Sequence, residues 1–288
     1  MKKITLLLLF LFSFCLIKGE WRGWNGDYSV QTLNYEMLTL PVQRPDLGNC
    51  TTYSSDALGI HHRICFDSVC ILIQAFVETF PDEAKKNGVG GYVDKKDLNL
   101  VPHTAEGYHG WLFFNGLYKA TFKDEYFLAY RNDSVYQKDS IPCPIIDESY
   151  SYNTSSPFVF PDSANTLLGI SGFLSNMPEP EGPMNTSING KSLKTDCKNF
   201  TDYFLVNGEP TNTNRCGFVL GSELKNLLSQ TDCVGMRYFF GYEPDRKSDK
   251  IRIIFIGVDK NGENILVNPD NTSQEAIFIE NEWPPSQN

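Results

Sequence analysis

The chain has 288 residues, of which 41% are hydrophobic and 21% charged, so it has an ordinary globular composition and room for one large domain or two small ones. Its formal net charge of −10, with no basic patch in the sequence, argues against a nucleic-acid partner, because an acidic surface repels a polyanion. The 20 Phe and 14 Tyr residues favour sheets over helical bundles.

Residues 1–19 have the pattern of a secretory signal peptide. Two lysines precede an apolar run over 4–17, and the small Gly19 stands before a plausible cleavage point. The run is shorter than the roughly 20 residues that a membrane-spanning helix needs, and no later run is long enough. A lipid anchor at Cys15 is a less favoured alternative, because the bulky Phe14 precedes it. We therefore expect an exported protein, secreted or periplasmic, without a transmembrane span.

Residues 20–56 form an aromatic, glycine-punctuated N-terminal arm. Trp21, Trp24 and Tyr28 allow two interpretations. The favoured one is an arm that packs on the following domain, and the other is an aromatic platform for a sugar.

A first unit follows over 57–148. Apolar residues recur at helical spacing from Phe66 to Phe80, and Pro81 ends that pattern. The rest of the unit is expected to contain an extended piece at 90–93, a short helical turn at 94–100, and a hairpin of strands 110–116 and 124–131.

A second unit is expected over 190–288, after an ordered loop and linker at 149–189 that is rich in Ser, Asn, Pro and Gly. Its elements are predicted to be a helix at 193–205, a strand at 217–219, a helix at 222–228, a hairpin of strands 233–241 and 251–259, and a last strand at 275–281.

The two units align with each other as an internal repeat. Tyr92-Val93 matches Phe218-Val219 at an offset of 126, and the glycine-flanked aromatic strand at 110–116 matches 235–241 at an offset of 125. The predicted fold is therefore α+β, with two tandem related units that each hold a helix and a small antiparallel sheet. The competing explanation is coincidence among short aromatic strands.

The second unit resembles a family of uncharacterised, mostly exported bacterial proteins. The residues that carry this resemblance are the strand Cys233-Val234-Gly235-Met236-Arg237-Tyr238-Phe239-Phe240-Gly241, the turn Gly257-Val258-Asp259-Lys260-Asn261-Gly262 and the tail Pro284-Pro285. The family pattern has a cysteine before the two prolines, where this chain has Trp283. The resemblance implies fold and export but no activity. If the family's tail cysteine pairs with the one on the strand, Cys233 is an odd thiol here.

Of the eight cysteines, Cys15 lies in the signal segment and seven remain, so at least one has no disulfide partner within the chain. Spacing does not determine connectivity. Our first prediction for a disulfide is Cys197 with Cys216, because that pair closes a short loop inside one unit.

All four histidines lie in the first unit. A zinc or copper site from His61 (or His62), Cys65, His103 and His109 is chemically conceivable, since imidazole and thiolate suit those ions. The spacing matches no known motif, and ordinary surface or strand histidines are favoured.

Two further sites are weaker alternatives. A cysteine hydrolase using Cys65 or Cys70 with His103 would need an activated thiol, and structural disulfides are favoured in an exported protein. The stretch 259–264 resembles a calcium loop superficially, but Asn261-Gly262 is better explained as a tight turn.

The sequence thus predicts an exported protein that binds an unknown protein or carbohydrate ligand without catalysis and without a cofactor. A metal-dependent or cysteine hydrolase with its site in the first unit is the alternative. A purely structural envelope component is the third possibility.

Overall fold

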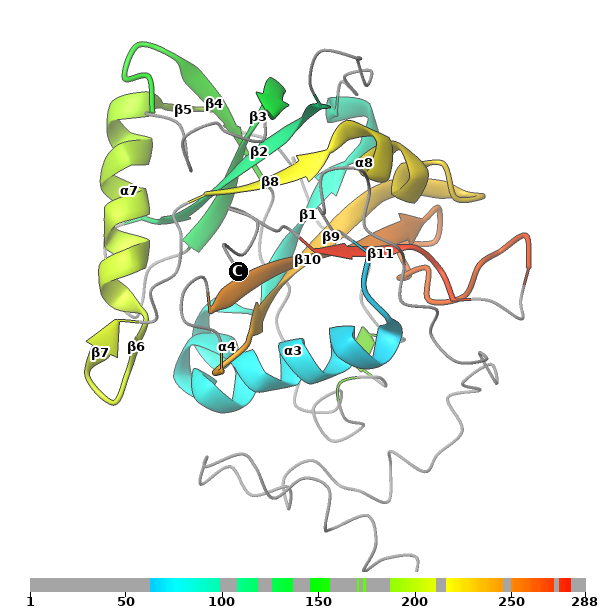
Figure 1. The fold of residues 1–288 in the computed structure, drawn as a ribbon, viewed down its shortest axis with the longest axis horizontal. Coiled ribbons are helices and arrows are strands. Elements are labelled where there is room, and N and C mark those ends of the chain that lie inside the picture. Colours follow the sequence, from blue (N-terminus) through cyan, green and yellow to red (C-terminus); the bar gives the residue numbers. More distant parts are fainter. Residues whose placement is uncertain are drawn as a thin grey trace, which may run out of the picture.

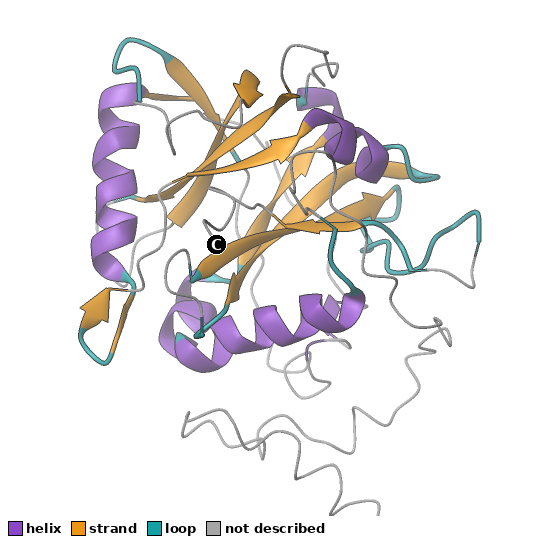
Figure 2. Cartoon of the chain, in the orientation of Figure 1, coloured by secondary structure: helices purple, strands orange, loops and turns teal. Residues whose placement is uncertain are grey.

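The computed structural model describes residues 63–98, 108–118, 126–136, 146–155, 170, 173–174, 187–210, 216–245, 250–271 and 275–280. These residues form helices and antiparallel sheets, so the predicted α+β class is confirmed (Figure 2). The signal segment and the N-terminal arm, with Trp21, Trp24 and Tyr28, lie outside the described residues. None of the helices in the described ranges is long and apolar enough to cross a membrane.

Two sheets make up the centre of the molecule. The four-stranded sheet has the order β1 (Gly90–Asp94), β9 (Cys233–Tyr242), β10 (Ile251–Asp259) and β11 (Phe278–Glu280). The five-stranded sheet has the order β5 (Ser187–Asn189), β4 (Ser151–Thr154), β3 (Tyr126–Tyr136), β2 (Tyr108–Leu117) and β8 (Cys216–Leu220). A separate two-stranded ribbon joins β6 (Leu205–Val206) and β7 (Glu209–Pro210).

The helices flank these sheets (Figure 1). Helix α7 (Gly190–Tyr203) packs on β2 of the five-stranded sheet, and α3 (Phe66–Thr79) packs on β9 of the four-stranded sheet. The shorter α4 (Pro81–Asn87) follows α3, and α8 (Gly221–Leu228) follows β8 directly. The helical turn expected at 94–100 is a short 3-10 helix, η1 (Lys95–Asp97).

Helix α3 forms where the sequence predicts it, and α7 begins and ends a few residues before the predicted 193–205. In α3 the buried side chains Val69, Ile73 and Phe76 lie on one face, as the three- and four-residue spacing requires. The chain turns at Phe80, and Pro81 begins α4, because a proline at the first helical position loses no intrahelical hydrogen bond. In α7 the Asn189 side chain caps the first turn by accepting the Ser192 N–H at 2.9 Å.

Each sheet contains strands from both halves of the chain. Strand β1, from the first half, pairs with β9 from the second, and β8, from the second half, pairs with β2 from the first. The tandem arrangement predicted for 57–148 and 190–288, with one sheet in each unit, is therefore not confirmed. The short strands are buried along almost their whole length, and each lies against the hairpin of the other half.

Aromatic side chains join the two sheets. The rings of Phe113 on β2 and Phe255 on β10 lie 4.7 Å apart, centroid to centroid, and both are fully buried. A buried hydrogen bond of 2.9 Å between the hydroxyls of Tyr238 on β9 and Ser155, just after β4, also crosses from one sheet to the other. Since an unpaired buried hydroxyl is costly, this bond favours the observed arrangement of the two sheets.

The cysteines differ from the prediction. Cys65 and Cys216 are disulfide-bonded, while Cys70, Cys197 and Cys233 are reduced. The predicted Cys197–Cys216 bond is therefore wrong. Cys197 lies on the buried face of α7 and packs there as a small hydrophobic side chain. The expectation that Cys233 is an odd thiol is confirmed, and its S–H donates to the Gly235 carbonyl.

Candidate functional site

The predicted metal site is only partly within the described residues. His61 and His103 lie outside them, and His109 lies at the start of β2. Cys65 is disulfide-bonded, so its sulfur is not available as a thiolate, and its assignment as a metal ligand is wrong. Across the described ranges, no three His, Cys, Asp or Glu side chains are grouped so that they could hold a metal ion.

His109 still has one unusual property. Its Nδ1 atom is buried and has no hydrogen-bond partner among the residues that the structure describes, a costly arrangement for a ring nitrogen. The same disulfide removes Cys65 as a hydrolase nucleophile. Cys70 is reduced and half-buried on α3, but the predicted base, His103, lies outside the described residues, so that pairing stays a prediction.

The stretch 259–264 is the tight turn that the sequence favours. The Asp259 carboxylate accepts the backbone N–H groups of Asn261 and Glu263 at 2.8 and 2.9 Å. Gly262 has a φ of 81°, and its carbonyl accepts a bond of 2.7 Å from Arg237. The Asp259 carboxylate oxygen that a calcium ion would need is thus engaged by the turn itself.

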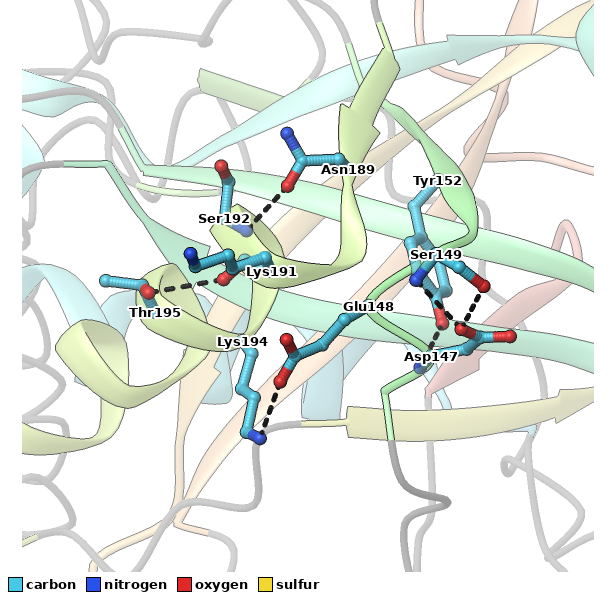
Figure 3. Close-up of polar contacts among 9 residues, drawn as sticks. All are labelled: Asp147, Glu148, Ser149, Tyr152, Asn189, Lys191, Ser192, Lys194 and Thr195. Carbon is cyan, nitrogen blue, oxygen red and sulfur yellow. Dashed lines mark hydrogen bonds and ion pairs between the residues drawn. The ribbon is translucent and has the colours of Figure 1, made fainter.

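A polar surface with several mutual contacts lies where 147–152 meets the first turns of α7 (Figure 3). The Asp147 carboxylate accepts both the N–H and the O–H of Ser149, at 2.9 and 2.6 Å, and these bonds lower its pKa. The Tyr150 N–H closes the turn on the Asp147 carbonyl at 3.2 Å. The carboxylate is therefore ionised, exposed and fixed in direction.

The first residues of helix α7 hold this turn in place. The Gly190 N–H donates to the Tyr150 carbonyl at 2.9 Å. A Cβ atom on Gly190 would stand 1.8 Å from the Asp147 carbonyl oxygen, so only glycine allows this approach. An exposed ion pair of 3.0 Å between Lys194 and Glu148 adds a second link between helix and turn (Figure 3).

Tyr150 is the exposed aromatic residue of this turn, with 37% of its surface accessible. Its ring meets the buried Tyr152 ring edge-on at 4.9 Å, and the Arg131 guanidinium lies 4.8 Å from its centroid. The Tyr152 hydroxyl in turn accepts the Asp147 N–H at 3.1 Å. We call Arg131, Asp147, Ser149 and Tyr150 the Tyr150 surface.

The Tyr150 surface combines an oriented aromatic ring with a cation, an anion and a hydroxyl. Such a ring can stack on a flat apolar face, and the polar groups beside it can exchange hydrogen bonds with a ligand. The sequence analysis missed this surface, because it assigned 149–189 to a loop and linker and considered an aromatic platform only near Trp21, as the less favoured alternative. The alternation of Tyr150 and Tyr152 on either side of Ser151 was the available signal for a strand there.

The fold and this surface define an α+β protein built on two antiparallel sheets, with a polar, aromatic turn beside one helix end. No protein-family model, curated protein or solved structure matches the chain significantly. The resemblance to exported bacterial proteins therefore stays a prediction.

Proposed function

We propose that this is an exported protein that works by binding a carbohydrate at the Tyr150 surface rather than by catalysis. The observation that supports this best is the Tyr150 ring, part-exposed yet held by the Tyr152 edge at 4.9 Å and the Arg131 guanidinium at 4.8 Å. An aromatic ring that is already ordered loses little conformational entropy when a ligand stacks on it.

The polar groups favour a sugar as the ligand. The exposed Asp147 carboxylate stands within the same turn as the ring. Both Ser149 bonds reach its Oδ1 atom, so its Oδ2 atom and the Ser149 hydroxyl oxygen can accept hydrogen bonds from sugar hydroxyls. A stable protein interface buries about 800 Å² on each partner, far more than a single part-exposed ring offers. A protein partner would therefore need apolar surface beyond this turn.

An oligosaccharide array followed by calorimetry tests the proposal. Tyr150→Ala should weaken the affinity of the best array ligand about tenfold, because an aromatic contact contributes roughly 0.5–1.5 kcal/mol beyond its buried area. Tyr118→Ala is the matched control, since Tyr118 is also exposed but lies just after β2. Absence of any oligosaccharide binding, or binding that Tyr150→Ala leaves unchanged, would refute the proposal.

A metal-dependent hydrolase in the first unit is the second candidate, supported by the buried Nδ1 of His109, which has no hydrogen-bond partner in the described part of the chain. It would use His109 with His103 and His61, without Cys65. Metal analysis of the purified protein decides it. Stoichiometric zinc or copper that is lost in His109→Ala and kept in the control Tyr118→Ala would favour this candidate, and metal-free protein would remove it.

A further inference from the structure

The two long hairpins have the same register. In β2–β3, Phe113 stands opposite Tyr130, and adding 125 to each number gives Tyr238 and Phe255, which stand opposite each other in β9–β10. Adding 125 also converts the pairs on both sides of this one. Leu112–Arg131 corresponds to Arg237–Ile256, and Leu117–Tyr126 corresponds to Tyr242–Ile251.

Strands β1 and β8, which each pair with the hairpin of the other half, also share one register. Adding 126 to a residue of β1 gives a residue of β8, and the partner strands β9 and β2 differ by 125. All five cross-strand pairs then transfer: Gly90–Phe239 to Cys216–Phe114, Gly91–Tyr238 to Gly217–Phe113, Tyr92–Arg237 to Phe218–Leu112, Val93–Met236 to Val219–Trp111, and Asp94–Gly235 to Leu220–Gly110. A slip of one residue would turn every side chain to the opposite face, so unrelated strands have no reason to agree in this way.

The helices agree as well. Helices α3 and α7 each have 14 residues, and their buried positions Val69, Ile73 and Phe76 correspond to Leu193, Cys197 and Phe200 at an offset of 124. Each helix is followed by a phenylalanine whose N–H donates to the phenylalanine carbonyl four residues earlier. Each also packs on the hairpin of the other half, α3 on β9 and α7 on β2.

We propose that the chain is a fused dimer of two homologous halves, 63–136 and 187–280, which have exchanged their long helix and first strand. Two independent tandem units would instead pair β1 with β2 and β8 with β9. The observed pairing is the reciprocal one, as in a domain-swapped dimer whose two copies are joined in a single chain.

This arrangement makes each half dependent on the other for folding. Val93 on β1 and Val219 on β8 are both fully buried, each under the hairpin of the other half. Separated halves would leave two strand edges unpaired and would expose the apolar faces of both helices. Neither half should therefore fold alone.

The test uses the full chain with a site-specific protease sequence inserted between Pro180 and Glu181, cleaved after folding. The nicked protein is run on a sizing column in reductant, under conditions in which the uncut chain keeps its circular dichroism. Reductant is needed because the disulfides of Cys65 and Cys216 would otherwise be able to tie the halves together. The peptides are then separated in denaturant, and each is returned to native buffer alone and in a 1:1 mixture.

We expect the nicked protein to elute with the uncut protein, and each separated half to show no cooperative thermal transition. The proposal is overturned if the nicked halves elute apart while each keeps its secondary structure. A cooperative transition from either half alone, in a species that elutes as a monomer, overturns it too. A mixture that regains the transition of the nicked protein, when neither half has one, supports the proposal directly.

Discussion

Asp196 is a buried acid whose removal should stabilise the protein. It lies on the inner side of α7, is 5% exposed, and its Oδ2 has no hydrogen-bond partner within the described residues. Burial disfavours its ionised form and raises its pKa from an ordinary value of 3.8 to about 6. Asp196→Asn keeps the shape of the side chain and removes the charge.

The size of the expected change in the free energy of unfolding follows from the pKa of Asp196 in the folded and the unfolded chain. The folded protein binds a proton at Asp196 below about pH 6, whereas the unfolded chain does so only below about pH 3.8, so stability falls as the pH rises through this window. Above about pH 6 the buried Asp196 lowers the free energy of unfolding by roughly 3 kcal/mol, and at pH 4.5 it lowers it by about 1 kcal/mol. The substitution should therefore raise the free energy of unfolding by about 2 kcal/mol more at pH 7.5 than at pH 4.5.

Urea unfolding of the wild type and Asp196→Asn at both pH values measures this difference. Asp202→Asn is the matched control, since Asp202 lies on the same helix but is exposed and paired with Lys198. Its effect should stay within about 0.5 kcal/mol at both pH values. If Asp196→Asn changes stability equally at pH 7.5 and 4.5, the carboxylate is not held in an apolar site and the reasoning fails.

Three other substitutions or measurements test the described contacts. Arg237→Met should lower the free energy of unfolding by about 3 kcal/mol in urea, because it leaves buried acceptors such as the Asn264 Oδ1 without their donor; wild-type stability would contradict this. Gly190→Ala should lower the free energy of unfolding by about 2 kcal/mol or more and speed amide exchange in the 147–152 turn, since its Cβ would clash with the Asp147 carbonyl. Unchanged exchange would show that the turn can move away from the added methyl group without loss of structure. Burial raises the pKa of the Cys233 thiol, so peptide mapping after labelling with a thiol reagent should find it modified only in unfolded protein, and modification in the native state would refute its burial.

The elements were predictable from local sequence, but their pairing was not. The hairpin at 233–241 and 251–259 and the helix at 222–228 formed close to their predicted bounds, because apolar spacing and turn residues act over a few positions. The last strand is shorter than the predicted 275–281 and covers Phe278–Glu280 only. Which hairpin edge a five-residue strand joins is decided by contacts distant in sequence, and two homologous hairpins offer almost the same edge.

Buried polar residues were missed for a related reason. Arg252 is buried on β10 and pairs with Glu243 at 3.2 Å and Glu280 at 2.9 Å, so one cation joins three segments of the second half. A charged residue inside an apolar strand pattern looks like an exposed position in the sequence. Its burial becomes evident only when both carboxylates are placed beside it.

Arg131 belongs both to the internal repeat and to the Tyr150 surface. Arg131 on β3 corresponds to Ile256 on β10, which is fully buried, so the two halves differ here in the side chain they carry. Strand β4 adjoins β3, and the turn before it brings Tyr150 to within 4.8 Å of the Arg131 guanidinium. Arg131→Ile restores the residue of the other half. If this arginine serves the ligand surface rather than the scaffold, the variant should keep its cooperative melt and lose oligosaccharide affinity to the extent that Tyr150→Ala does. Loss of the cooperative thermal transition itself would show that Arg131 stabilises the fold.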